Sequence, residues 1–133
     1  MGKNIFHLSL FVVLFTISCN KNPEIGKWKD NIKLSQKTIN FSSDANSVVV
    51  TTESTGWWLN GITFNEKNVD LKNTKYTDQS FVIANADFQV ERKDGNKIII
   101  TMNQNTTGSD RKLIVGLQNG DYFDGLNVTQ SKK

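Results

Sequence analysis

Short runs of alternating apolar and polar residues fill most of this chain after its first thirty or so positions. Ile39 and Phe41 are separated by one polar residue, and residues 48–52 are β-branched throughout. An apolar residue at every second position places one set of side chains on a single face of a strand. Turn-forming pairs such as Asp94-Gly95 separate the runs. The pattern therefore predicts strands, and no helical period competes with it after Cys19.

The number and spacing of these runs predict the fold class. We expect seven or eight strands, over residues 38–41, 48–52, 56–64, 81–84, 88–92, 97–102, 112–117 and 122–130. Many short strands with regular turn signals indicate two antiparallel sheets packed face to face. We therefore predict an all-β protein with an immunoglobulin-like two-sheet β-sandwich as its single domain, over residues 33–130.

The same alternation predicts which side chains fill the core. Trp58 is placed in the core because it is an even number of residues from Ile62 and Phe64 on the expected third strand. The full predicted core comprises Ile39, Phe41, Val48, Val50, Trp58, Phe88, Val90, Ile98, Ile100, Leu113, Val115, Leu126 and Val128.

The beginning of the chain has the features of a lipoprotein leader. Lys3 precedes an apolar run over residues 5–18, and the only cysteine, Cys19, follows it directly. A basic start and a short apolar stretch are typical of a secretory signal, and the run is shorter than the roughly 20 residues of a membrane span. Thr16 departs from the usual lipobox, which has leucine at that position. We predict a signal peptide over residues 1–18, a diacylglycerol- and palmitate-bearing Cys19, and a tether over residues 19–32.

This leader predicts the location of the protein. We expect an outer-membrane lipoprotein of the cell envelope, held to the membrane by its lipid and facing either the periplasm or the cell surface. Plain secretion with a free thiol at Cys19 is the alternative.

Composition excludes most catalytic chemistry. The single histidine, His7, lies in the leader, and a lipidated Cys19 is no nucleophile. Ser-His and Cys-His catalysis and the usual zinc sites are thereby removed. The formal net charge of +3 falls to +2 without Lys3, which is too small to indicate nucleic-acid binding. We predict no enzymatic activity, no cofactor and no metal.

The second half of the chain resembles a known family. Residues 97–100, Asn105-Thr106-Thr107-Gly108, Arg111 and the closing Val128-Thr129-Gln130 are similar to the end of a BACON domain, the Bacteroidetes-associated carbohydrate-binding domain that is often N-terminal. Residues 48–52 and Trp57-Trp58 resemble its first half. The resemblance implies an immunoglobulin-like sandwich on a surface lipoprotein and a role in glycan or mucin binding. From the residues alone, Asn105 and Gly108 fit a turn with a left-handed residue, and Arg111 and Gln130 have structural roles.

Three aromatic residues are the candidate ligand contacts: Trp57, Tyr76 and Phe123. Aromatic faces stack on the C–H side of a pyranose ring, and amides and carboxylates bind its hydroxyls. Trp57 is either such a platform or a packing residue beneath the polar loop of residues 65–80. Tyr76 lies in that loop. Phe123 is expected to face outward because Tyr122 shares the parity of Leu126 and Val128.

Two functions of different classes remain open. The first is a non-enzymatic surface lipoprotein that binds glycan or mucin. The second is a structural spacer or assembly module for envelope protein complexes. The first requires exposed aromatic residues on one face, whereas the second requires an exposed apolar patch or an open strand edge.

Overall fold

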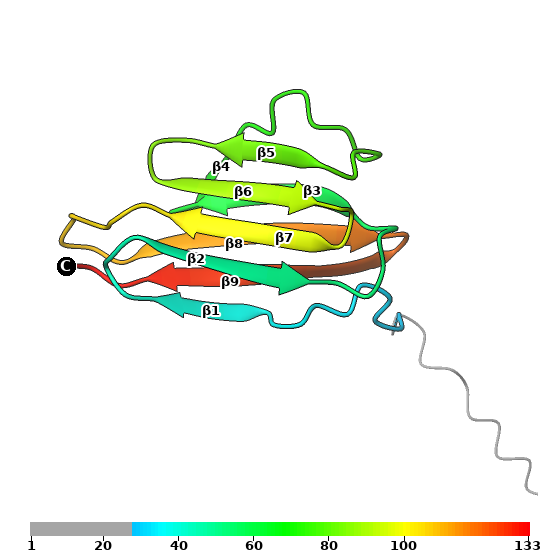
Figure 1. The fold of residues 1–133 in the computed structure, drawn as a ribbon, viewed down its shortest axis with the longest axis horizontal. Helices are drawn as coiled ribbons and strands as arrows, with labels where there is room; N and C mark the ends of the chain where they lie inside the picture. The colour runs from blue at the N-terminus through cyan, green and yellow to red at the C-terminus, as the bar shows by residue number, and fades with distance from the viewer. Residues whose placement is uncertain (1–27) are drawn as a thin grey trace, which may run out of the picture.

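The computed structural model describes residues 28–133, so Cys19 and the predicted signal peptide lie outside the described residues. Two β-sheets pack face to face (Figure 1). This confirms the predicted all-β, two-sheet sandwich. Within residues 28–133 no helix is long and apolar enough to cross a membrane. The strands are β1 (Thr38–Phe41), β2 (Asn46–Thr51), β3 (Trp58–Phe64), β4 (Lys67–Asn68), β5 (Phe81–Ala84), β6 (Phe88–Lys93), β7 (Lys97–Met102), β8 (Arg111–Asn119) and β9 (Tyr122–Gln130).

The strand order separates the chain into a five-stranded and a four-stranded sheet. The first has the order β1-β9-β8-β3-β4, and the second has the order β2-β7-β6-β5. All neighbours are antiparallel except β1 and β9, which run parallel. The β8–β9 hairpin and the start of β3 lie at the same end of the sandwich, on the right in Figure 1. Loops from different parts of the sequence therefore meet there.

The core lies between the inner faces of the two sheets. Of the predicted core, Phe41 and Val48 are only partly buried and pack against it, and Trp58 lies outside it. Ile32 is fully buried, although the sequence placed it in the tether. The buried apolar residues are Ile32, Ile39, Val50, Trp57, Leu59, Ile62, Ile83, Phe88, Val90, Ile98, Ile100, Met102, Leu113, Val115, Leu117, Leu126 and Val128.

A β-bulge in β3 explains why the parity argument placed the wrong tryptophan in the core. The register against β8 shifts between Leu59 and Gly61, so one extra residue, Asn60, lies on β3. An extra residue reverses the alternation on its two sides. The Trp57 side chain therefore faces the core and is 2% exposed, whereas Trp58 faces outward and is half-buried.

The turn before β8 is held by a side chain rather than by a left-handed backbone. The fully buried Asn105 donates from its amide nitrogen to the carbonyls of Ser109 and Ser131, at 2.8 and 3.1 Å. Its amide oxygen accepts from the backbone N–H of Thr107 at 3.0 Å. Neither Asn105 nor Gly108 has a positive φ, so that part of the prediction is wrong. An Asx-type turn satisfies the backbone without one.

Arg111 and Gln130 have the structural roles that the sequence predicted. The Arg111 guanidinium pairs with Asp87 at 3.0 Å and donates to the carbonyl of Asn103 at 3.4 Å. The Gln130 amide nitrogen donates to the carbonyls of Asp44 and Asn103, each at 3.0 Å. Both residues thereby join β9 and β8 to loops at the end of the sandwich opposite the β8–β9 hairpin.

Candidate functional site

Three side chains from separate strands lie in one row on the outer face of the five-stranded sheet, the face turned away from the other sheet. Trp58 on β3 is paired with Gln118 on β8, and Gln118 is paired with Phe123 on β9. Directly opposed residues on neighbouring strands project from the same face, about 5 Å apart. We call Trp58, Gln118 and Phe123 the outer row. It presents an aromatic ring, an amide and a second aromatic ring in line.

Tyr76 extends the outer row beyond Trp58. Their ring centroids are 6.3 Å apart at an interplanar angle of 73°, an edge-to-face contact. Tyr76 is 73% exposed, although Trp58 supports it. Beside this pair lies a hollow of about 300 Å³, the Tyr76 hollow, which is lined by Thr55, Gly56, Trp57, Trp58, Tyr76, Thr77 and Gln79.

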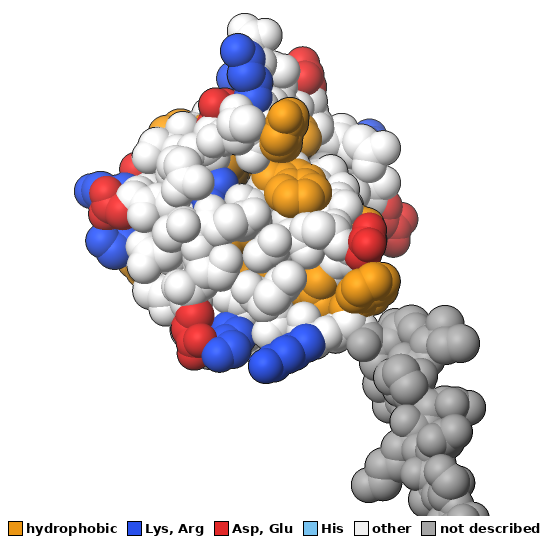
Figure 2. All heavy atoms as spheres, turned by 90° about the vertical axis from the view of Figure 1, so that its right-hand side faces the viewer, with side chains coloured by type: hydrophobic (Ala, Val, Ile, Leu, Met, Phe, Trp, Pro, Cys, Tyr) orange, Lys and Arg blue, Asp and Glu red, His pale blue; other side chains and the backbone are white. Residues whose placement is uncertain are grey.

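The end of the sandwich that carries these residues is uncharged over much of its surface. Figure 2 looks onto this end and shows separate hydrophobic side chains among uncharged polar ones, with most charged side chains toward the rim. Separate aromatic side chains surrounded by polar groups differ from the continuous apolar patch of a stable protein interface.

Arg92 positions the Tyr76 hollow from below. Its guanidinium is 2% exposed and lies 3.7 Å from the centroid of the Trp57 ring. It donates to the carbonyls of Thr55 and Asp78, each at 2.8 Å, and to that of Gly95 at 2.8 and 3.1 Å. One buried side chain thus joins three loops, and burial lowers the pKa of this guanidinium.

Trp57 is the packing residue of this arrangement rather than a ligand contact. Its indole Nε1–H donates to the Thr52 hydroxyl at 2.9 Å, and Thr52 donates to the Ser54 carbonyl at 2.6 Å. With Arg92 on its ring, no face of Trp57 is available for stacking. Of the two roles that the sequence left open for Trp57, the structure favours packing beneath the loop.

Phe123 is held outward by its neighbours on β9. Tyr122 packs partly against the core, and Asp124 pairs with Lys37 at 2.8 Å. The hydrogen bond to Asp124 raises the pKa of Lys37. Phe123 is 58% exposed, as the alternation predicted.

The sequence predicted two residues of the surface formed by the outer row and Tyr76, and it did not predict the other two. Tyr76 and Phe123 are exposed at the same end of the sandwich, as candidate contacts must be. Trp58 was missed because it was assigned to the core, and Gln118 because nothing linked it to either aromatic residue. Gly61 within β3 was the available signal, since an isolated glycine inside a strand often marks a bulge.

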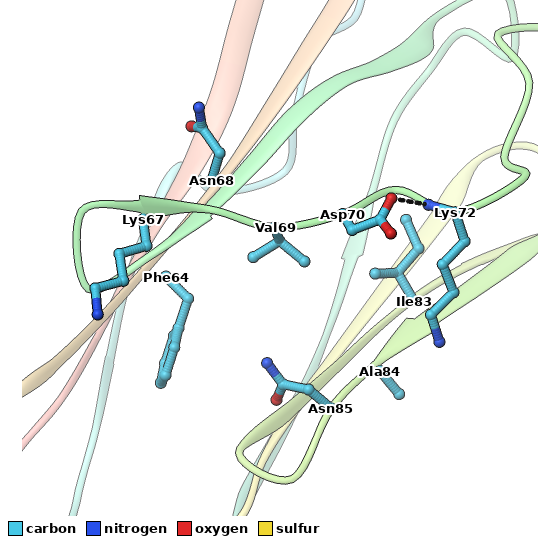
Figure 3. A pocket seen from close by; sticks show the side chains of 9 residues that line it. All are labelled: Phe64, Lys67, Asn68, Val69, Asp70, Lys72, Ile83, Ala84 and Asn85. Carbon is cyan, nitrogen blue, oxygen red and sulfur yellow. Dashed lines mark hydrogen bonds between the residues drawn. The ribbon is translucent and has the colours of Figure 1, made fainter.

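A second hollow lies where the edge strands β4 and β5 separate. It measures about 340 Å³, and we call it the edge hollow; Figure 3 shows Phe64 and Val69 directed into it. The Phe64 ring packs on Phe88, with centroids 5.0 Å apart, so its face is already used in the core. This hollow therefore offers apolar surface but no free aromatic platform. Its lining is Phe64, Lys67, Asn68, Val69, Asp70, Lys72, Ile83, Ala84 and Asn85.

The side chains of the outer row can make stacking and hydrogen-bonding contacts. Within the described residues no group of three or more histidine, cysteine, aspartate or glutamate side chains lies close enough to hold a metal ion. Trp58 and Phe123 supply stacking surfaces, and Gln118 supplies an amide whose nitrogen donates to the Gly120 carbonyl at 2.9 Å. That bond ties the Gln118 amide to the turn between β8 and β9.

Comparison with known proteins supports the fold and is silent on the site. No family model matches the chain, and no curated protein matches it. The fold is similar to the NMR structure of a protein from Bacteroides thetaiotaomicron. The two share 18% sequence identity with a TM-score of 0.65, over 85% of this chain and 97% of that chain. At this identity the likeness shows the fold alone.

Proposed function

We propose that this chain is a non-enzymatic, lipid-anchored protein of the cell envelope that binds glycan through the outer row and Tyr76. The observation that carries the proposal is the cross-strand register of Trp58, Gln118 and Phe123. Two aromatic side chains about 10 Å apart, with an amide between them, offer a sugar both apolar stacking surfaces and a polar contact. The fold itself carries no weight here, because sandwiches serve many functions.

The supporting features are those that separate sugar contacts from protein interfaces. The aromatic side chains stand apart on a polar surface, and the hollow beside them is shallow. Stacking without a deep pocket gives weak binding, so we expect dissociation constants in the high micromolar range or above, which is about 4–6 kcal/mol of binding free energy.

A glycan array probed with a soluble form that begins at Asn20 tests this function. We expect Trp58→Ala and Phe123→Ala each to reduce binding at least about tenfold, or about 1.4 kcal/mol, because each removes a stacking face. Val82→Ala is the matched control, since Val82 is 54% exposed on the other sheet. Melting curves should place all three variants close to the wild type. An array on which no glycan is retained, or retention unchanged in both aromatic variants, would contradict the proposal.

A second function, docking of an envelope protein, is favoured by one specific observation. Val49, Ile99, Glu91 and Val82 lie in register across the outer face of the four-stranded sheet, and Val49 and Val82 are each 54% exposed on its edge strands. Exposed apolar residues on edge strands suit a protein contact. Glu91 interrupts this row, which is why we rank docking second. A partner protein that cross-links to the wild type but not to Val82→Asp, together with a glycan array that retains no glycan, would favour docking.

Membrane anchoring through Cys19 rests on the leader alone. We expect the wild-type protein to fractionate with membranes and to carry an acyl mass on its mature N-terminus, because the lipid supplies the attachment. Cys19→Ala should remain unprocessed or appear in the soluble fraction, with Ser18→Ala as the control that keeps the thiol. A wild-type protein that is soluble and free of acyl groups would contradict the anchor while leaving glycan binding intact.

A further inference from the structure

A third hollow lies on the same outer face as the outer row, further along β8 and β9. It measures about 270 Å³ and is lined by Lys112, Ile114, Asn127, Val128 and Thr129; we call it the lateral hollow. Ile114 is 45% exposed there, flanked in register by Thr63 on β3 and Asn127 on β9. An apolar side chain between a hydroxyl and an amide reverses the order of the outer row, in which an amide lies between two aromatic rings.

The strip between the outer row and the lateral hollow has no side chains on its three central positions. Gly61, Gly116 and Gly125 are paired across β3, β8 and β9, directly after the outer row. A Cβ at Gly61 would meet no heavy atom within 4 Å, so the space above it is open. A Cβ at Gly125 would lie 2.6 Å from the Val115 carbonyl oxygen, so that position accepts only glycine. These three positions therefore add no side chain to the surface between the two contact regions, and the Asn60 Cβ lies beside them, 3.8 Å from where a Gly116 Cβ would be.

The length of this strip sets the size of ligand that it fits. Phe123 and Thr129 both face outward on β9 and are six residues apart, which corresponds to about 20 Å along an antiparallel strand. That span exceeds a disaccharide. A strip whose central positions carry no side chains suits an extended chain, and β-1,4-linked sugars form flat ribbons whereas α-1,4-linked sugars coil.

We infer that the ligand is an extended β-1,4-linked oligosaccharide, which lies along β8 and β9 from the outer row to the lateral hollow. The inference rests on the proposed glycan-binding function and adds the ligand's linkage, its length and a second contact region. One end of the oligosaccharide lies over Gln118, with the Trp58 and Phe123 rings on either side of it. Its middle crosses the glycines, and its far end meets Ile114, Asn127 and Thr129.

A size series of defined oligosaccharides tests the ligand class. The full-length protein, kept in detergent, is titrated by calorimetry with two- and six-unit cello-, xylo- and chito-oligosaccharides and with maltohexaose. We expect at least one β-1,4-linked hexasaccharide to bind about tenfold more tightly than its disaccharide, and more tightly than maltohexaose. Equal affinity for both lengths, preference for maltohexaose, or no binding of any β-1,4-linked hexasaccharide would overturn the inference.

Two variants locate the ligand on the strip. Gly61→Ile fills the open space above the strip with a rigid β-branched side chain that strands accept, and it should lower hexasaccharide affinity about tenfold. Gly108→Ile is the matched control, because a Cβ there also meets nothing within 4 Å but lies in the turn before β8. Ile114→Ala removes an exposed contact in the lateral hollow and should lower hexasaccharide but not disaccharide affinity, which keeps the test decisive if Gly61→Ile misfolds. Full affinity in a folded Gly61→Ile and in Ile114→Ala would overturn the inference.

The outcomes separate this inference from the proposed function. If array binding depends on Trp58 and Phe123 but not on Gly61 or Ile114, the protein binds a short glycan at the outer row and the strip is unused. If binding depends on none of these residues, the proposed function fails together with the inference.

Discussion

Trp57→Ala is expected to lower the free energy of unfolding by about 3–5 kcal/mol, the usual cost of removing a large buried aromatic side chain. Trp57 is 2% exposed, stacks under the Arg92 guanidinium and donates to the Thr52 hydroxyl. The change leaves a cavity, an unstacked buried guanidinium and a hydroxyl without its donor. Urea unfolding followed by circular dichroism measures the loss.

The adjacent tryptophan is the matched control for this change. Trp58→Ala removes the same type of side chain one position further along the chain, where it faces outward. We therefore expect it to lower the free energy of unfolding by about 1 kcal/mol or less. The two variants should therefore reverse roles, since Trp57→Ala loses stability and Trp58→Ala loses glycan binding. A stable Trp57→Ala with impaired binding would return Trp57 to the ligand contacts and contradict the bulge in β3.

Arg92→Leu should cost about 3 kcal/mol or more of unfolding free energy. The guanidinium donates to the carbonyls of Thr55, Asp78 and Gly95 in partly or fully buried hydrogen bonds, and an apolar replacement removes this donor from all three. Because Asp78 follows Tyr76 in the same loop, hydrogen exchange at residues 76–79 should also accelerate. Denaturant titration and exchange mass spectrometry measure the two effects.

Lys93→Leu provides the control, because Lys93 is exposed at the end of the same strand and its loss should change stability by about 0.5 kcal/mol or less. If Arg92→Leu is as stable as Lys93→Leu and leaves exchange at residues 76–79 unchanged, Arg92 does not organise the Tyr76 hollow.

Local pattern determined the strands well because each strand depends mainly on its own alternation. The bounds predicted for residues 38–41, 81–84, 97–102 and 122–130 are those of β1, β5, β7 and β9. These runs combine β-branched or aromatic residues with turn residues at both ends. The two-sheet architecture followed from the number of strands and their spacing.

The tryptophan assignment failed because a bulge depends on pairing with a second strand. Nothing in residues 56–64 shows that Asn60 is the extra residue, since the shift appears only against β8. Arg92 was missed for a related reason. Arg92 alternates with the same period as the buried Phe88 and Val90, so the pattern alone places it inside. A buried arginine is rare unless it is paired, and the partners of Arg92 are carbonyls from loops distant in the sequence.

The candidate site was predictable only in part because the pairing register of β3, β8 and β9 brings its residues together. Tyr76 and Phe123 could be chosen from their types and positions, whereas their proximity to Trp58 and Gln118 depends on which strands are neighbours. The order β9-β8-β3 cannot be read from alternation, yet it places those side chains in one row. The glycine row depends on the same order.

Nuclear magnetic resonance titration of ¹⁵N-labelled protein with a glycan retained on the array tests glycan binding at the outer row most directly. Trp57 and Trp58 each contribute an indole N–H signal, so buried and outward tryptophans report separately. We predict that the Trp58 indole signal, the Gln118 side-chain amide and the Phe123 backbone amide shift progressively with added glycan, while the Trp57 indole signal stays in place. Shifts confined to the edge hollow near Val69 and Ile83, or no shift at the outer row at saturating glycan, would contradict the account.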